Sequence, residues 1–222
     1  MKEIMICVAP YPGEKQEEKF PGKMDVADEA IRSCNAGACI AHLHVRNENG
    51  LQTTDTKYFR RDCEKIHSQC SIIIEGSTGG APEHTLSERC VSFTVENVEM
   101  GSLNLGSINM FSDVYKNPLP DIIFYAKELQ KRKLKPFIDC FDLSHFSSFT
   151  RLEKLNLIHP PYTVGLVFDI PDSLPYNDRY LDLFLQEIPS DCVWFLVRHH
   201  AKGAESFVKA IELGGHIRVG YE

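Results

Sequence analysis

Two histidines, His42 and His44, are the residues of this chain whose types and spacing most clearly point to chemistry. In a strand, side chains two residues apart project from the same face, so both imidazoles could bind one metal ion. A helix stop at Gly37 and the small and β-branched residues after it place the pair near the C-terminal end of a buried strand. Two strand histidines that form hydrogen bonds in the core would give the same pattern, and the spacing leaves both interpretations open.

A loop rich in glycine follows the next apolar run. Residues 75–80 read EGSTGG, in which the glycines let backbone amides approach a bound group while Ser77 and Thr78 offer hydroxyls. Such a loop can hold a carboxylate or a phosphate. A tight turn between a strand and a helix is the alternative interpretation.

Polar residues also stand near the ends of later apolar runs. Ser102 and Asn104 would share one face of a strand, and Arg218 and Glu222, four residues apart, would share one face of the last strand. Asp139 is an acidic residue inside the apolar run FIDCFD, where a charge requires a partner or a function.

Two imidazoles and one carboxylate form a common catalytic zinc set, which leaves further positions open for water or substrate. Glu222 could supply the carboxylate, although the residues alone do not choose among the available carboxylates. His199 and His200 form a rival pair, but adjacent strand residues point to opposite faces, so both could not face one metal ion.

The elements that must position these residues alternate between strands and helices. Amphipathic helical spacing occurs at residues 26–34, 122–129, 177–188 and 204–213. The hydrophobicity of the strand-like runs is continuous, as in parallel strands that are covered on both faces. These eight runs are 4–9, 40–45, 71–76, 98–103, 136–141, 163–168, 192–197 and 217–220. The alternation predicts an α/β fold of the (β/α)₈ TIM-barrel class, with the active site at the C-terminal ends of the strands.

No linker-like segment interrupts residues 1–222, so we expect a single catalytic barrel domain. The sequence ends directly after the eighth run, whereas a typical barrel of this class has about 250 residues. We therefore expect a domain truncated at its C-terminus that lacks the last covering helix. An uncovered flank would favour association into a homo-oligomer, a dimer or a tetramer.

Composition excludes several classes of protein. A net charge of −7, with only one short basic run at residues 131–135, argues against a nucleic-acid partner. Eight cysteines without a C-x-x-C spacing indicate reduced thiols in a cytoplasmic protein. The N-terminal run does not resemble a signal peptide, and no stretch approaches the roughly 20 apolar residues that span a membrane, so we expect no membrane partner.

Four motifs, in order along the chain, resemble those of the beta-keto acid cleavage enzymes. They are AGACIAHLHVR at 36–46 with Gly50 after it, STGG at 77–80, SLNLG at 102–106 and GGHIRVGYE at 214–222. The resemblance extends over nearly the whole chain and implies a zinc-dependent (β/α)₈ acyltransferase. Such an enzyme reacts a beta-keto acid with acetyl-CoA, as co-substrate, to give acetoacetate and a new acyl-CoA.

The resemblance also implies roles for single residues. Zinc would be bound by His42, His44 and Glu222. Asp139 stands in the place of a glutamate, Ser102 stands in the place of a threonine, and Arg218 matches an arginine that works with an aspartate expected directly after Glu222. The substrate-binding residues that we expect are Ser77, Gly80, Ser102, Asn104, Asp139 and Glu14, and the catalytic residues are Arg218, Asp139 and Ser77.

Three hypotheses follow for the function. The leading one is the acyltransferase, in which zinc polarises a keto group. The second is an amidohydrolase-like hydrolase, in which the same zinc site activates water. The third is a catalytically silent, truncated barrel that keeps metal binding.

Overall fold

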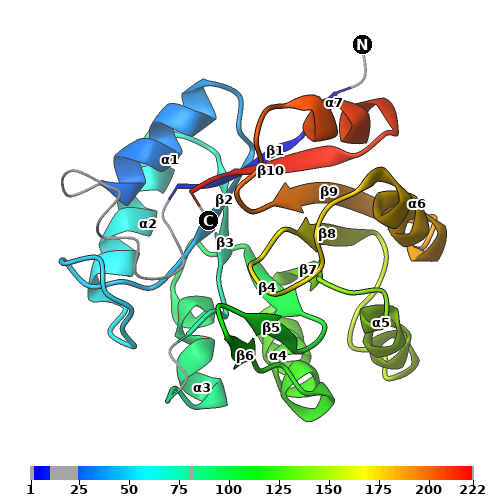
Figure 1. The fold of residues 1–222 in the computed structure, drawn as a ribbon. Helices are drawn as coiled ribbons and strands as arrows, with labels where there is room; N and C mark the ends of the chain where they lie inside the picture. The colour runs from blue at the N-terminus through cyan, green and yellow to red at the C-terminus, as the bar shows by residue number, and fades with distance from the viewer. Residues whose placement is uncertain (1–2, 11–24, 81–82, 222) are drawn as a thin grey trace. The chain divides into compact units, whose positions relative to one another are not determined.

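A computed structural model describes residues 3–10, 25–80 and 83–221 of the chain. Eight strands follow one another in the order β1-β10-β9-β8-β7-β4-β3-β2 and close into a parallel barrel, which confirms the predicted fold class (Figure 1). The strands of the barrel are β1 (Ile6–Ala9), β2 (Ile40–Leu43), β3 (Ile73–Gly76), β4 (Met100–Asn104), β7 (Lys135–Cys140), β8 (Tyr162–Phe168), β9 (Cys192–Arg198) and β10 (His216–Gly220).

A helix lies between each two barrel strands that follow one another along the chain, and the amphipathic spacing predicts four of these helices, at residues 26–34, 122–129, 177–188 and 204–213. The helices are α1 (Val26–Asn35), α2 (Lys57–Gln69), α3 (Leu86–Arg89), the 3₁₀ helix η2 (Val91–Thr94), α4 (Leu119–Arg132), α5 (His145–Lys154), α6 (Asp178–Glu187) and α7 (Glu205–Glu212). Side chains cap several N-termini: Asp25 accepts from the backbone of Asp28, and Thr85 and Glu88 form a capping box. Within the described ranges, none of these helices has the length and apolar character needed to cross a membrane.

The chain divides into two compact units. The N-terminal unit consists chiefly of the residues up to Ser102, with Arg132–Lys135, and the C-terminal unit chiefly of Leu103–Lys131 and Pro136–Arg218. Whether residues 1–222 form one domain, as we expect from the sequence, stays a prediction.

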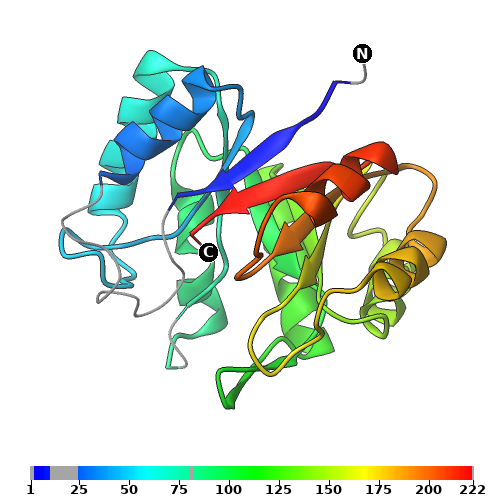
Figure 2. The same ribbon diagram turned by 45° about the horizontal axis from the view of Figure 1, so that its top comes forward.

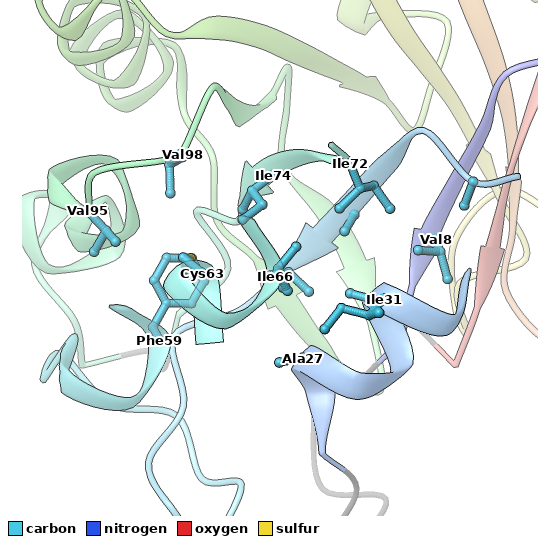
Figure 3. Close-up of a cluster of buried hydrophobic side chains, with 14 residues drawn as sticks. Val8, Ala27, Ile31, Phe59, Cys63, Ile66, Ile72, Ile74, Val95 and Val98 are labelled. Atoms are coloured by element: carbon cyan, nitrogen blue, oxygen red, sulfur yellow. The ribbon is translucent and has the colours of Figure 1, made fainter. Parts of the chain in front are cut away.

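Apolar side chains from two helices and the first strands form the core of the N-terminal unit. Ile31 of α1, Ile66 of α2 and Ile74 of β3 point into one cluster (Figure 3). Ile66 and Ile74 are fully buried, and each such side chain contributes roughly 1.5–3 kcal/mol to folding. This packing holds β2 and β3 side by side, with His42 opposite Glu75 in the register of the two strands.

The C-terminal unit has its own core and one element that the sequence does not predict. Phe137 of β7 packs against Phe195 of β9, with ring centroids 5.2 Å apart. Strands β5 (Ile108–Met110) and β6 (Asp113–Tyr115) form an antiparallel hairpin after β4 (Figure 2). These two strands have three residues each, too few to show an alternating pattern.

The eight cysteines are all free thiols, four of them buried, as expected from the absence of C-x-x-C spacing. The position of His44 differs slightly from the prediction. Strand β2 ends at Leu43, so His42 lies within the strand and His44 directly after it.

Candidate active site

His42 and His44 bring two imidazole nitrogens together at the end of β2. The Nε2 atoms of the two rings lie 3.3 Å apart, and the rings meet edge to face with centroids 5.1 Å apart. His42 is only 3% exposed, while His44 is half-buried. The side chains therefore lie on one side of the strand end, as their spacing predicts.

Glu75 of β3 lies next to His42, its partner in the register of β2 and β3. Its Oε1 atom is 3.0 Å from Nδ1 of His42 and accepts a hydrogen bond of 2.9 Å from the hydroxyl of Ser102. The Glu75 side chain is fully buried. This contact escaped the sequence reasoning, although an acidic residue at the end of the apolar run SIII was a signal of the same kind as Asp139.

The loop after β3 is built as the glycine-rich sequence suggests. Ser77 accepts a hydrogen bond of 2.9 Å from the backbone N–H of Gly79 through its Oγ atom. A Cβ atom on Gly79 would lie 2.9 Å from Cε1 of His44, so only glycine lets the loop approach this ring without displacing it. Arg89 of α3 donates to the carbonyl of Thr78 at 3.0 Å, which ties the loop to the helix that follows.

The C-terminal unit carries a second group of the predicted residues. Nη1 of Arg218 lies 3.5 Å from Oδ2 of Asp139, and both side chains are buried. Gly165 of β8 makes room for this carboxylate, because a Cβ atom there would lie 2.3 Å from Oδ1 of Asp139. Asn104 donates to the hydroxyl of Tyr115 at 3.0 Å and so contacts the β5–β6 hairpin.

Cys140 follows Asp139 but does not have the character of a nucleophile. Burial, and then the charge of Asp139, raise the pKa of the Cys140 thiol well above its usual value. The thiolate is the nucleophilic form of cysteine, so this residue stays inert near neutral pH.

The histidine pair fits a metal ion in the chemistry of its donors and in its spacing. Two nitrogens that are each about 2.1 Å from one tetrahedral zinc ion lie about 3.4 Å apart, close to the separation of the two Nε2 atoms. Among the residues that the structure describes, no group of three or more histidine, cysteine or acidic side chains could hold a metal ion. Glu222, the expected third ligand, and Glu14, an expected substrate contact, lie outside the described residues.

Comparisons with a family model and with known proteins agree on one family. The family model described as "beta-keto acid cleavage enzyme" matches residues 3–222. The chain is similar to a 3-keto-5-aminohexanoate cleavage enzyme of Fusobacterium nucleatum, with 32% identity over all of this chain and 83% of the relative. It is also similar to a 3-oxoadipate:acetyl-CoA acetyltransferase of Cupriavidus necator, with 31% identity over 84% of this chain and 66% of the relative.

A solved structure supports the fold at lower identity. The ternary complex of ObcA with a C4-CoA adduct and oxalate superposes with a TM-score of 0.67 and 17% identity. The match covers 89% of this chain but only 56% of the ObcA chain. At this identity the likeness concerns the fold alone.

Proposed function

The chain belongs to the beta-keto acid cleavage enzyme family, and on that premise we propose that it transfers an acyl group between a beta-keto acid and acetyl-CoA. The reaction would cleave the bond between C2 and C3 of the keto acid and give acetoacetate and a new acyl-CoA. The observation that carries the proposal is the pair of Nε2 atoms 3.3 Å apart at the end of β2. The pair lies at the C-terminal end of a strand, and this fold class carries its active sites at those ends.

We propose that His42 and His44 hold a zinc ion, with Glu222 as the third ligand. The bound ion would polarise the keto group as a Lewis acid. The two neutral imidazoles supply nitrogen donors, and a single carboxylate completes the common catalytic set. Imidazole and carboxylate also suit other divalent ions, so zinc is the proposal and metal analysis is its test.

We propose that Ser77 of the loop after β3 contacts the substrate. Its Oγ atom accepts from Gly79, and within the described ranges no hydrogen bond uses its hydroxyl proton. That proton can be donated to a carboxylate oxygen of the substrate. Gly80, in the same loop, would let the backbone approach the substrate. Ser102, whose hydroxyl donates to Glu75, would contact the substrate beside that residue.

Asp139 and Arg218 would supply charge and proton transfer. A guanidinium beside a carboxylate restricts the orientation of both groups, and buried acids and bases in fixed positions contribute about 10²- to 10⁴-fold to a rate. We propose that Arg218 orients a carboxylate that moves the proton, and that Asp139 binds a polar group of the substrate. Asn104 would add an amide contact, positioned by Tyr115.

The test is the dependence of product formation on acetyl-CoA. The zinc-loaded enzyme is incubated with 3-keto-5-aminohexanoate, 3-oxoadipate and other beta-keto acids, with and without acetyl-CoA, and acetoacetate is measured. We expect acetoacetate only when acetyl-CoA is present. Turnover of an amide or ester without CoA would instead support the hydrolase, and no turnover of any beta-keto acid would contradict the proposal.

A matched pair of variants tests the role of the histidines. His42→Ala should lose bound zinc and at least about 100-fold in activity, because it removes a ligand. His67→Ala is the control, since His67 lies on α2 and contacts the carbonyl of Asn97 at 3.0 Å, away from the pair. A His42→Ala enzyme that keeps both its zinc content and its activity would contradict the proposed site.

A further inference from the structure

Glu75 is a buried carboxylate to which the proposed reaction assigns no step. It lies near the end of β3, fully buried, directly after three isoleucines. Removing a carboxylate from water costs several kcal/mol unless hydrogen-bond donors compensate it. The hydroxyl of Ser102 donates to the Oε1 atom of Glu75, and Nδ1 of His42 lies 3.0 Å from the same oxygen.

The contact with His42 determines which ring nitrogen carries the proton. An ionised carboxylate only accepts hydrogen bonds, so the charge of Glu75, with Oε1 3.0 Å from Nδ1 of His42, favours the proton on that ring nitrogen. In the neutral imidazole Nε2 is then the unprotonated nitrogen, and Nε2 is the atom that faces His44. The lone pair of His42 is thereby directed toward the space between the two rings.

We propose that Glu75 is a positioning residue that fixes the tautomer and the ring orientation of His42 for metal binding. This inference rests on the proposed zinc site. Glu75 is not itself the missing third ligand, because it contacts Nδ1, on the side of the ring away from Nε2. Carboxylates that hold a ligating histidine in this way influence metal affinity by about 10- to 100-fold.

Ser102 contacts Glu75 in turn. Its hydroxyl donates to the oxygen atom that His42 contacts, which holds the carboxylate against rotation. The pairing of β2 with β3 and of β3 with β4 brings all three side chains into neighbouring positions. The arrangement therefore depends on paired strands and not on a loop.

The experiment compares zinc affinity in four variants of the full chain, by competition with a chromophoric chelator. Glu75→Leu should bind zinc about 10- to 100-fold more weakly than wild type. Glu75→Gln should lose less than Glu75→Leu, because its amide oxygen can still accept from Nδ1. Glu99→Gln is the matched control: Glu99 is half-exposed and accepts from the backbone of Ile74, so this variant should bind zinc as wild type does. His42→Ala should lose the zinc site and so gives the zinc affinity that is measured without it.

A second measurement reads the tautomer directly, without metal or activity. In ¹⁵N-detected spectra of the metal-free protein above pH 7.5, His42 should be protonated on Nδ1 in wild type and in Glu75→Gln. In Glu75→Leu the proton should redistribute toward Nε2. If Glu75→Leu does not fold, the wild-type tautomer and the Glu75→Gln affinity still decide, since a wild-type His42 protonated on Nε2 would overturn the inference.

The outcomes separate the two proposals. If His42→Ala loses zinc but Glu75→Leu keeps wild-type affinity and tautomer, the role of Glu75 is wrong and the zinc site stands. If wild type and His42→Ala bind zinc equally, the zinc site is wrong and the role of Glu75 in it falls as well.

Discussion

Asp139 and Arg218 illustrate how single residues of this site depend on each other. Their charged atoms are 3.5 Å apart and both side chains are buried. A pair of this kind contributes little net stability, because each charge has lost its hydration. Removing one partner is costly, since the other charge stays buried and loses part of its compensation.

We therefore expect Asp139→Asn to lower the free energy of unfolding by about 3 kcal/mol, as measured by urea denaturation. Arg218→Met should also lower the free energy of unfolding. The loss in the double variant should be at least about 1 kcal/mol smaller than the sum of the two single losses. Effects that add to within about 0.5 kcal/mol would show that the two charges do not interact.

At the scale of the residue, the sequence predicts which side chains of one strand share a face better than it predicts contacts between strands. The His-x-His spacing predicts a shared face, and the Nε2 atoms do converge. The same sequence does not reveal that Glu75 stands opposite His42, because this contact depends on the register between β2 and β3. Strand register depends on packing across the sheet, which local spacing does not contain.

At the scale of elements, His145 joins the end of β7 to the start of α5. Its Nδ1 atom accepts a hydrogen bond of 3.2 Å from the backbone N–H of Phe141, and the side chain is buried. Burial lowers the pKa of His145, and the charge of Asp142 and a backbone hydrogen bond with Ser107 oppose this shift without cancelling it. The folded protein therefore holds His145 in its neutral form near pH 7.

This lowered pKa predicts a dependence of stability on pH. The unfolded chain takes up a proton at His145 near pH 6.5, while the folded chain resists it until a lower pH. The contribution of His145 to stability is thus complete above about pH 6.5 and is lost as the pH falls toward the folded pKa. In metal-free protein, urea denaturation between pH 7 and 5 should show a decline that is shallower in His145→Gln, by at most about 1.4 kcal/mol per pH unit. Equal slopes for the two proteins would contradict the neutral, buried form.

Element boundaries show what the sequence can and cannot predict. The continuous apolar runs locate all eight barrel strands, and the helix expected at 177–188 appears as Asp178–Glu187 with Asn177 as its N-cap. The β5–β6 hairpin is not predicted, because its turn contains Phe111 and Ser112 at positive φ. Such turns usually contain Asn or Gly, so the usual hairpin signal is missing here.

At the scale of the whole molecule, fold and family are established more firmly than the substrate. The closed order of eight strands and the family match over residues 3–222 agree with each other. The substrate is a finer property, because it depends on the few side chains that contact it, among which we propose Asp139 and Ser102. Barrels of one topology catalyse many reactions, so the chemistry has to be argued from the site.

The most direct test of the transferase proposal follows the carbon atoms. The zinc-loaded enzyme is given acetyl-CoA labelled with ¹³C at both acetyl carbons, together with an unlabelled beta-keto acid substrate, and the acetoacetate is analysed by mass spectrometry. The proposed acyl transfer predicts acetoacetate with two labelled carbons, in step with formation of a new acyl-CoA. Unlabelled acetoacetate, or acetoacetate formed at the same rate without acetyl-CoA, would contradict it.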